Sequence, residues 1–161
     1  MSQQLNNINR STTSFNSISF QQKSTGLSLL ITSSLAAYYV ARMWPMRPIA
    51  LANDIIPEGY GGLLLSTVGL VIVAQIVLQS VLVFGAGGAP AATPLEKMAA
   101  SRAARIGYGV LAAAVFAAVG TVFLEELTPF CTANIAIMGF FLAEISKGSA
   151  QLIYARQTAS G

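Results

Sequence analysis

Histidine is absent from this chain and cysteine occurs once, at Cys131. Without histidine, the usual Cys/His zinc sites, His-ligated haem and His-based catalytic triads are excluded. A single cysteine cannot form an intrachain disulfide. We interpret Cys131, which lies near the end of an apolar segment, as a small packing residue, and we expect neither a metal site nor a cofactor.

Charge is also scarce, because only 9% of the residues are charged and 54% are hydrophobic. A soluble domain carries roughly a quarter charged residues. The nine basic residues outnumber the six acidic ones, and most of them flank apolar stretches. This composition predicts an integral membrane protein with positive-inside anchoring, and not a nucleic-acid-binding protein, which needs a dense basic face.

Residues 1–26 form a polar segment of serine, asparagine, glutamine and threonine without an acidic residue. They show no sustained apolar period, so we expect a disordered tail. A transit peptide is the alternative, but Arg10 and Lys23 are its only basic residues.

Four apolar stretches predict an all-α integral membrane protein, a four-helix bundle over residues 27–156 with a short tail at 157–161. A cleaved signal peptide competes for the first stretch, but the polar segment ahead of it is long and no clean cleavage site follows. The predicted spans cover residues 27–44, 61–84, 106–124 and 130–154.

The connection between the first two spans contains three prolines, Pro45, Pro48 and Pro57. We expect no regular helix there, because proline removes a backbone donor. Trp44 and Tyr60 flank this loop as interfacial aromatic residues do.

The third helix is expected to begin before its span. Thr93-Pro94-Leu95-Glu96 reads as a capping box with proline at the first helical position. A helix from residue 93 to residue 124 is about 50 Å long, whereas the hydrocarbon core is about 30 Å thick. Its first turns, with Lys97, Arg102 and Arg105, should therefore stand in water.

The distribution of charge predicts the orientation. The N-terminal side of the spans carries six basic residues and one acidic residue, and the other side carries two basic and four acidic residues. Both termini are therefore expected in the cytoplasm.

Small residues recur every four positions on the third span, at Gly109, Ala113, Ala117 and Thr121. Such repeats let helix backbones approach closely. We expect this small-residue stripe to form a helix contact, either inside the bundle or between subunits.

Glu144, Lys147 and Gln151 share one face of the fourth span, at 100° per residue. An ionisable residue inside a span is a candidate functional site. Three interpretations stay open: a local ion pair where the helix leaves the bilayer near Ser146, a ligand or proton site, and a contact for a partner. Gln75 and Gln79, one turn apart on the second span, are the expected partners of this face, unless they only lock two helices together.

The third and fourth helices contain a series of short motifs: Glu96-Lys97, Arg102, Arg105-Ile106-Gly107-Tyr108, Leu127-Thr128-Pro129-Phe130, Ala133-Asn134, Ala143-Glu144 and Gly148-x2-Gln151-Leu152-Ile153-Tyr154. With these motifs the two helices resemble a group of small, uncharacterised bacterial inner-membrane proteins with four spans. The resemblance implies a four-helix inner-membrane fold and no established enzymatic activity.

These observations favour a non-enzymatic membrane subunit or regulator. The small-residue stripe would contact another helix, and Lys97, Arg102 and Arg105 would contact a cytoplasmic protein. The alternative is an oligomeric transporter or small-ligand-binding protein that uses the polar face of spans two and four. An enzyme ranks third, since histidine and paired carboxylates are missing. The expected partners are the bilayer and either another protein or a second copy of the chain, with no nucleic acid.

Overall fold

The computed structural model describes residues 20–85, 93–124 and 127–159, and within these ranges the regular elements are all helices. Four of them are long and apolar enough to cross a membrane, which confirms the all-α prediction with four candidate spans. The elements are α2 (Phe20–Met43), the 3-10 helix η1 (Trp44–Met46), α3 (Arg47–Asn53), α4 (Tyr60–Gly85), α5 (Pro94–Thr121) and α6 (Pro129–Ala159).

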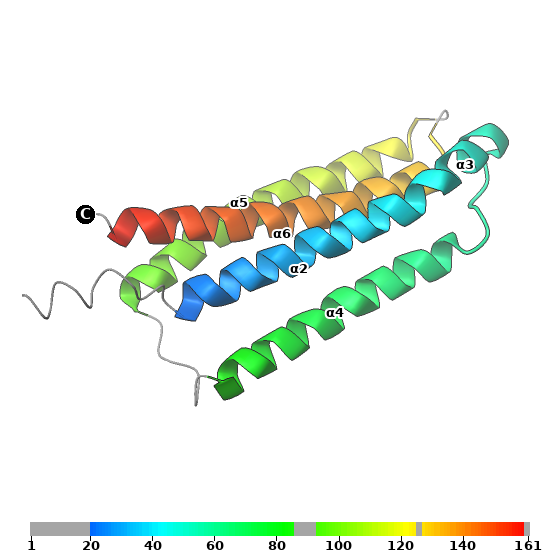
Figure 1. The fold of residues 1–161 in the computed structure, drawn as a ribbon. Helices are drawn as coiled ribbons and strands as arrows, with labels where there is room; N and C mark the ends of the chain where they lie inside the picture. The colour runs from blue at the N-terminus through cyan, green and yellow to red at the C-terminus, as the bar shows by residue number, and fades with distance from the viewer. Residues whose placement is uncertain (1–19, 86–92, 125–126, 160–161) are drawn as a thin grey trace, which may run out of the picture.

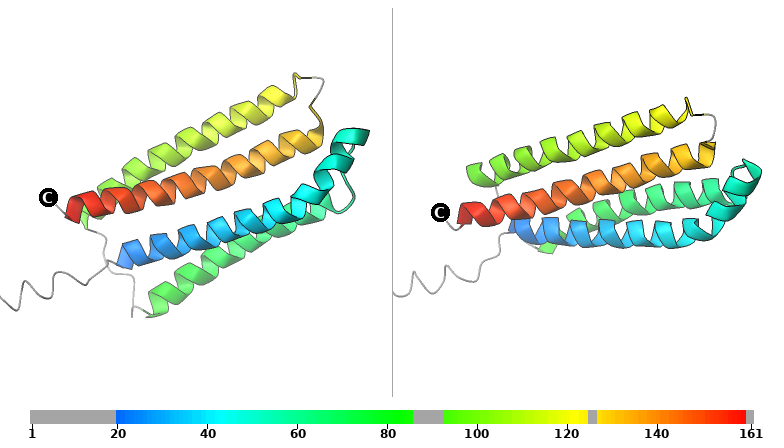
Figure 2. Two further views of the ribbon diagram at one scale, coloured as in Figure 1. Left: turned by 45° about the horizontal axis from the view of Figure 1, so that its top comes forward. Right: turned by 90° about the horizontal axis from the view of Figure 1, so that it is seen from above.

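The long helices form an open bundle in the order α5, α6, α2, α4 (Figure 1). The contact between α5 and α6 is the most extensive, and α2 joins this pair to α4. The left view of Figure 2 shows the same order. Consecutive helices in this row are antiparallel, so one end of the bundle, the terminal end, holds the start of α2, the start of α5 and the end of α6. The opposite end is the loop end.

The α5–α6 pair has a regular antiparallel register. Near the loop end Thr121 faces Thr132, with 2.7 Å between their hydroxyl oxygens. Further along, Gly139 lies so close to Ala114 that a Cβ at residue 139 would be 2.0 Å from the Ala114 Cβ. Interior packing at this density leaves no room for a methyl group there.

The first long helix begins earlier than predicted. α2 starts at Phe20, so residues 20–26, which were assigned to the disordered tail, are helical. Their polar side chains have tertiary neighbours: Gln22 and Thr25 line a small space together with residues of α5 and α6. The apolar period cannot reveal a helix that packs through polar side chains. Residues 1–19 lie outside the described residues.

The proline-rich connection is more regular than predicted, because it contains η1 and α3. Pro45 and Pro48 occupy the first turns of these helices, where a missing N–H costs no hydrogen bond. The chain then reverses at two residues with positive φ, Asp54 at 51° and Gly59 at 80°. Glycine adopts this conformation without strain, and Asp54 is the type of residue that tolerates it best.

The predicted capping box of α5 is confirmed. The Thr93 hydroxyl accepts from the Glu96 backbone N–H at 3.2 Å, and the Glu96 carboxylate accepts from the Thr93 N–H at 2.9 Å. The predicted end of this helix at residue 124 is wrong. After Thr121 the chain tightens into turns, with the Val122 N–H bonded to the carbonyl of Val119 at 3.1 Å.

The last helix runs beyond the predicted span to Ala159, so residues 157–159 are helical and are not part of a separate tail. Its start is capped by Thr128, whose hydroxyl accepts from the Cys131 N–H at 3.3 Å. Cys131 is half-buried and unpaired, and its sulfur also accepts from the Thr128 hydroxyl at 3.6 Å.

The best-packed core lies between α2, α4 and α6, toward the loop end. The largest side chains with the least exposure are Tyr39, Phe141 and Thr67, at 0%, 1% and 0%. The buried apolar residues of this cluster are Tyr39, Met43, Ala50, Tyr60, Leu63, Val71, Phe130, Ile137 and Phe141.

Candidate functional site

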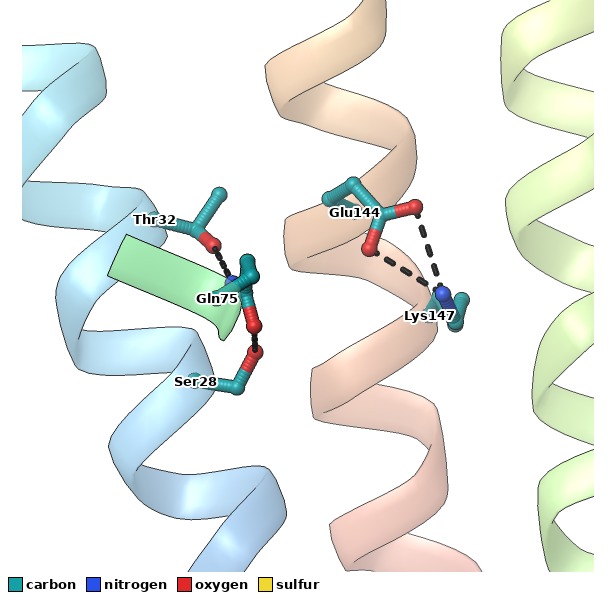
Figure 3. A network of polar contacts seen from close by, with 5 residues as sticks. All are labelled: Ser28, Thr32, Gln75, Glu144 and Lys147. Carbon is teal, nitrogen blue, oxygen red and sulfur yellow. Dashed lines mark hydrogen bonds and ion pairs between the residues drawn. The ribbon is translucent and has the colours of Figure 1, made fainter. Parts of the chain in front are cut away.

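The polar side chains predicted to form one site lie in three separate places, and Figure 3 shows two of them. Gln75 of α4 points at α2, whereas Glu144 and Lys147 lie together on the side of α6 that looks toward α5. The prediction that the two glutamines partner the Glu144 face is therefore wrong. Helical periodicity defined each polar face correctly but could not show which neighbouring helix it meets.

Both polar atoms of the Gln75 side-chain amide are hydrogen-bonded. Its carbonyl oxygen accepts from the Ser28 hydroxyl at 3.0 Å, and its amide nitrogen donates to the Thr32 hydroxyl at 3.3 Å. One turn on, the Gln79 amide donates to Ser24 at 3.5 Å. These bonds all connect α4 with α2. The glutamines thus form a polar lock between two helices, the simpler of the two interpretations.

Glu144 and Lys147 form the predicted ion pair. The Lys147 ammonium donates to both carboxylate oxygens of Glu144, at 3.2 and 3.1 Å. The Glu144 side chain is still 38% exposed and the Lys147 side chain 43% exposed. The pair is therefore held together but open on one side.

Gly107 of α5 determines where the Lys147 side chain runs. A Cβ on Gly107 would lie 2.9 Å from the Lys147 Cβ and 3.2 Å from the Ala143 carbonyl oxygen. The stem of the lysine thus lies across the α5 backbone. Sequence reasoning missed this glycine, although the spacing of Ala99, Ala103 and Gly107 is also four residues.

A hollow of about 100 Å³ opens beside the ion pair, between α5 and α6. Both charged groups border it, as does Tyr108, which is 71% exposed. We call this space the α5–α6 hollow. Its lining comprises Ala104, Gly107, Tyr108, Leu111, Phe140, Ala143, Glu144 and Lys147.

Gln151, the third member of the predicted polar face, lies elsewhere. It lines a much smaller space of about 10 Å³, one turn further toward the terminal end, together with Gln22, Thr25 and Glu96. The structure therefore brings Glu144 and Lys147 together and separates them from Gln151, Gln75 and Gln79.

The small-residue stripe is not the face that packs inside the chain. Gly109, Ala113 and Ala117 are exposed, and only Thr121 is buried. A four-residue repeat advances by 40° at each step around a helix, so only one end of the stripe meets α6. α5 instead buries Ala99, Ala103, Gly107, Ala118 and Thr121.

The basic residues predicted to face the cytoplasm, Lys97, Arg102 and Arg105, are all exposed on the first half of α5. Arg102 borders a second hollow of about 200 Å³, which Leu95, Met98 and Tyr154 also line.

A buried hydrogen-bonded cluster of three helices was missed by sequence reasoning. The Tyr39 hydroxyl donates to the side-chain amide oxygen Oδ1 of Asn134 at 2.6 Å and lies 2.9 Å from the Tyr60 hydroxyl. Tyr60 is only 3% exposed and packs inside the bundle, whereas Trp44 is 61% exposed. Three polar residues at unrelated spacings on different helices give no local signal in a sequence.

Comparison of the chain with protein-family models, curated proteins and solved structures gave no match. The function proposed below therefore rests on the residues of the site alone. Among the residues that the structure describes, no group of three or more His, Cys, Asp or Glu side chains could hold a metal ion.

Proposed function

We propose that this chain is a non-enzymatic, multi-pass membrane subunit that binds another membrane helix through the outer face of α5. The proposal includes four membrane crossings with both termini in the cytoplasm. It also includes the bacterial inner membrane as the location, which is what the resemblance of the third and fourth helices implies.

The register of α5 against α6 supports a position in which the apolar segments of both helices cross the membrane side by side. From Ile106 to its end at Thr121, α5 is free of charge over 16 residues, about 24 Å, and the uncharged chain continues through Leu124 toward the full hydrocarbon thickness of about 30 Å. The opposing stretch of α6 runs from Pro129 to the level of Lys147. Beyond this level lie the basic residues of both helices, as the positive-inside rule expects for a cytoplasmic end.

The observation that carries the proposal is that α5 has two faces of small residues and that, among the residues that the structure describes, only one of these faces packs against another helix. Gly109 has no atom within 4 Å of the position that its Cβ would occupy. Ala113 and Ala117 continue this open face. In a bilayer, close packing is a principal source of helix association, because lipid tails and apolar side chains are equally hydrophobic.

The arrangement of the helices adds support. α5 is an edge of the row, and its main contact is with α6. Phe116 of α5 is 78% exposed, and Phe123 in the turn just after α5 is 81% exposed, so both would flank a docked helix. Lys97, Arg102 and Arg105 extend from the same helix into the cytoplasm, where they would meet the partner's soluble part.

The test is partner retention after extraction in a mild detergent. Ala113→Leu places a bulky group on the open face and should abolish retention of the partner, or of a second copy, seen with the unchanged protein. Ala112→Leu is the matched control, because Ala112 is exposed on α5 but about 100° away from Ala113. The proposal fails if the unchanged protein retains no partner and does not self-associate, or if both variants behave alike.

A further inference from the structure

We propose that the α5–α6 hollow binds the headgroup of a phospholipid with a primary ammonium, phosphatidylethanolamine, with its phosphate on Lys147 and its ammonium on Glu144. The inference depends on the membrane level proposed above but not on a protein partner.

The level of the ion pair places it within reach of lipid headgroups. Lys147 packs on Gly107, only two residues from Arg105, the last charge of the α5 extension. Those two residues correspond to about 3 Å along the helix axis, so the lysine lies at the cytoplasmic edge of the apolar band. A lysine there extends its ammonium toward the interface.

The ion pair needs a polar neighbour. Its side chains keep 38% and 43% of their surface open, on a helix that would otherwise face hydrocarbon. Exposed charge is costly in lipid even when it is paired, because each group keeps unsatisfied hydrogen-bonding capacity. Among the bonds that the structure shows, the Lys147 ammonium donates only to Glu144. It therefore has a donor left for a further acceptor.

The charge pattern selects the headgroup. Glu144 and Lys147 are together neutral, so a lone anion meets a carboxylate beside the ammonium. A phosphate followed by an ammonium matches both signs at once. Ethanolamine can also donate hydrogen bonds to the carboxylate, whereas the quaternary ammonium of choline has no donor.

The lining of the hollow suits the rest of the lipid. Leu111 and Phe140 lie on the loop-end side of the ion pair and would contact an acyl chain. Tyr108 borders the hollow with an exposed ring, and its amphipathic side chain is typical of the membrane interface. Gly107 leaves the space that the lysine stem and the headgroup share.

The experiment is native mass spectrometry of the full-length protein after delipidation, with added dioleoyl phosphatidylethanolamine, phosphatidylglycerol or phosphatidylcholine. We expect a preference of about tenfold or more for the ethanolamine lipid, as charge-assisted hydrogen bonds provide. Glu144→Gln should remove this preference, and Lys147→Gln should weaken binding of the ethanolamine lipid about tenfold. Lys23→Gln, an exposed α2 charge outside the hollow, is the matched control and should keep the preference.

Leu111→Trp blocks the hollow and leaves both charges intact, so it tests the site even if a charge variant does not fold. It should lower retention of the ethanolamine lipid. Equal binding of the three lipids, preference for phosphatidylglycerol, or a preference that survives Glu144→Gln would overturn the proposal. Equally tight binding of soluble glycerophosphoethanolamine would overturn the assignment to a lipid.

The two proposals fail separately. Residues 111 and 113 are about 200° apart around α5, so the hollow and the open face lie on opposite sides of the helix. Ala113→Leu should release a protein partner and keep the lipid, whereas Leu111→Trp should do the reverse.

Discussion

Two of the antiparallel helix pairs, α5 with α6 and α2 with α4, are held together by different means. α5 and α6 approach closely at Gly107 and Gly139, where a Cβ on either glycine would clash with the opposite helix. α2 and α4 are joined by side-chain hydrogen bonds from Gln75 and Gln79 to serine and threonine hydroxyls. The α5–α6 contact depends on the absence of side chains, whereas α2 and α4 combine these polar bonds with the apolar core around Tyr39.

Because the two contacts differ, substitutions at them should lower the free energy of unfolding by different amounts. Hydrogen bonds between membrane helices contribute about 0.6 kcal/mol on average, because the separated helices also find partners. Overpacking a dense contact costs about 1–3 kcal/mol. The α5–α6 pair should therefore tolerate few substitutions at its contact, while the α2–α4 pair should lose stability in small steps.

The largest effect is expected from Gly139→Ala. The added methyl group would sit 2.0 Å from the Ala114 Cβ and 3.4 Å from its Cα, so the helices must separate. We expect the free energy of unfolding in detergent to fall by about 3 kcal/mol.

Two control variants make this prediction specific. Gly109→Ala meets no atom and should be neutral or stabilising, since alanine favours a helix by about 1 kcal/mol over glycine. Ala114→Gly combined with Gly139→Ala moves the methyl group to the other helix and should recover most of the loss. Equal losses for Gly109→Ala and Gly139→Ala would show that the close contact is not what holds α5 to α6.

A smaller effect is expected where polar and apolar packing meet, at Tyr39. Tyr39→Phe keeps the ring on Phe141 but removes the hydroxyl that bonds Asn134 and Tyr60. Loss of a buried hydrogen bond with unsatisfied partners costs about 2 kcal/mol of unfolding free energy. Tyr38→Phe, on an exposed ring of the same helix, should leave stability unchanged. Equal effects of the two substitutions would contradict the role of the buried cluster.

The smallest effects are expected from the polar lock. Gln75→Leu removes two hydrogen bonds to α2 and should lower the free energy of unfolding by about 1 kcal/mol. Gln79→Leu removes one long bond at an exposed position and should cost less than about 0.5 kcal/mol. A larger cost for Gln79→Leu than for Gln75→Leu would refute this order of contributions.

Local chemistry explains which parts of the fold could be predicted from the sequence. The capping box at Thr93 and Glu96 was predictable because both partners lie three residues apart. The pairing of Glu144 with Lys147 was predictable for the same reason. The start of α2 at Phe20 was not, because its first turns pack through polar residues that resemble a disordered segment.

The candidate site could be predicted only in part. Periodicity placed Gln75 on a polar face of α4, but its partners Ser28 and Thr32 lie on a helix whose position depends on the whole bundle. The stripe beginning at Gly109 and the buried series through Ala103 and Gly107 look alike in sequence. Only the packing of α5 on α6 distinguishes the used face from the open one.

The alternating direction of neighbouring helices has an electrostatic consequence. Every helix carries a macrodipole equivalent to roughly half a charge at each end, and antiparallel neighbours in a medium of low dielectric constant attract each other. All three neighbouring pairs in the row α5, α6, α2, α4 are antiparallel. At the open edge, where α5 lacks a second neighbour of this kind within the described chain, the same attraction favours a partner helix that runs opposite to α5.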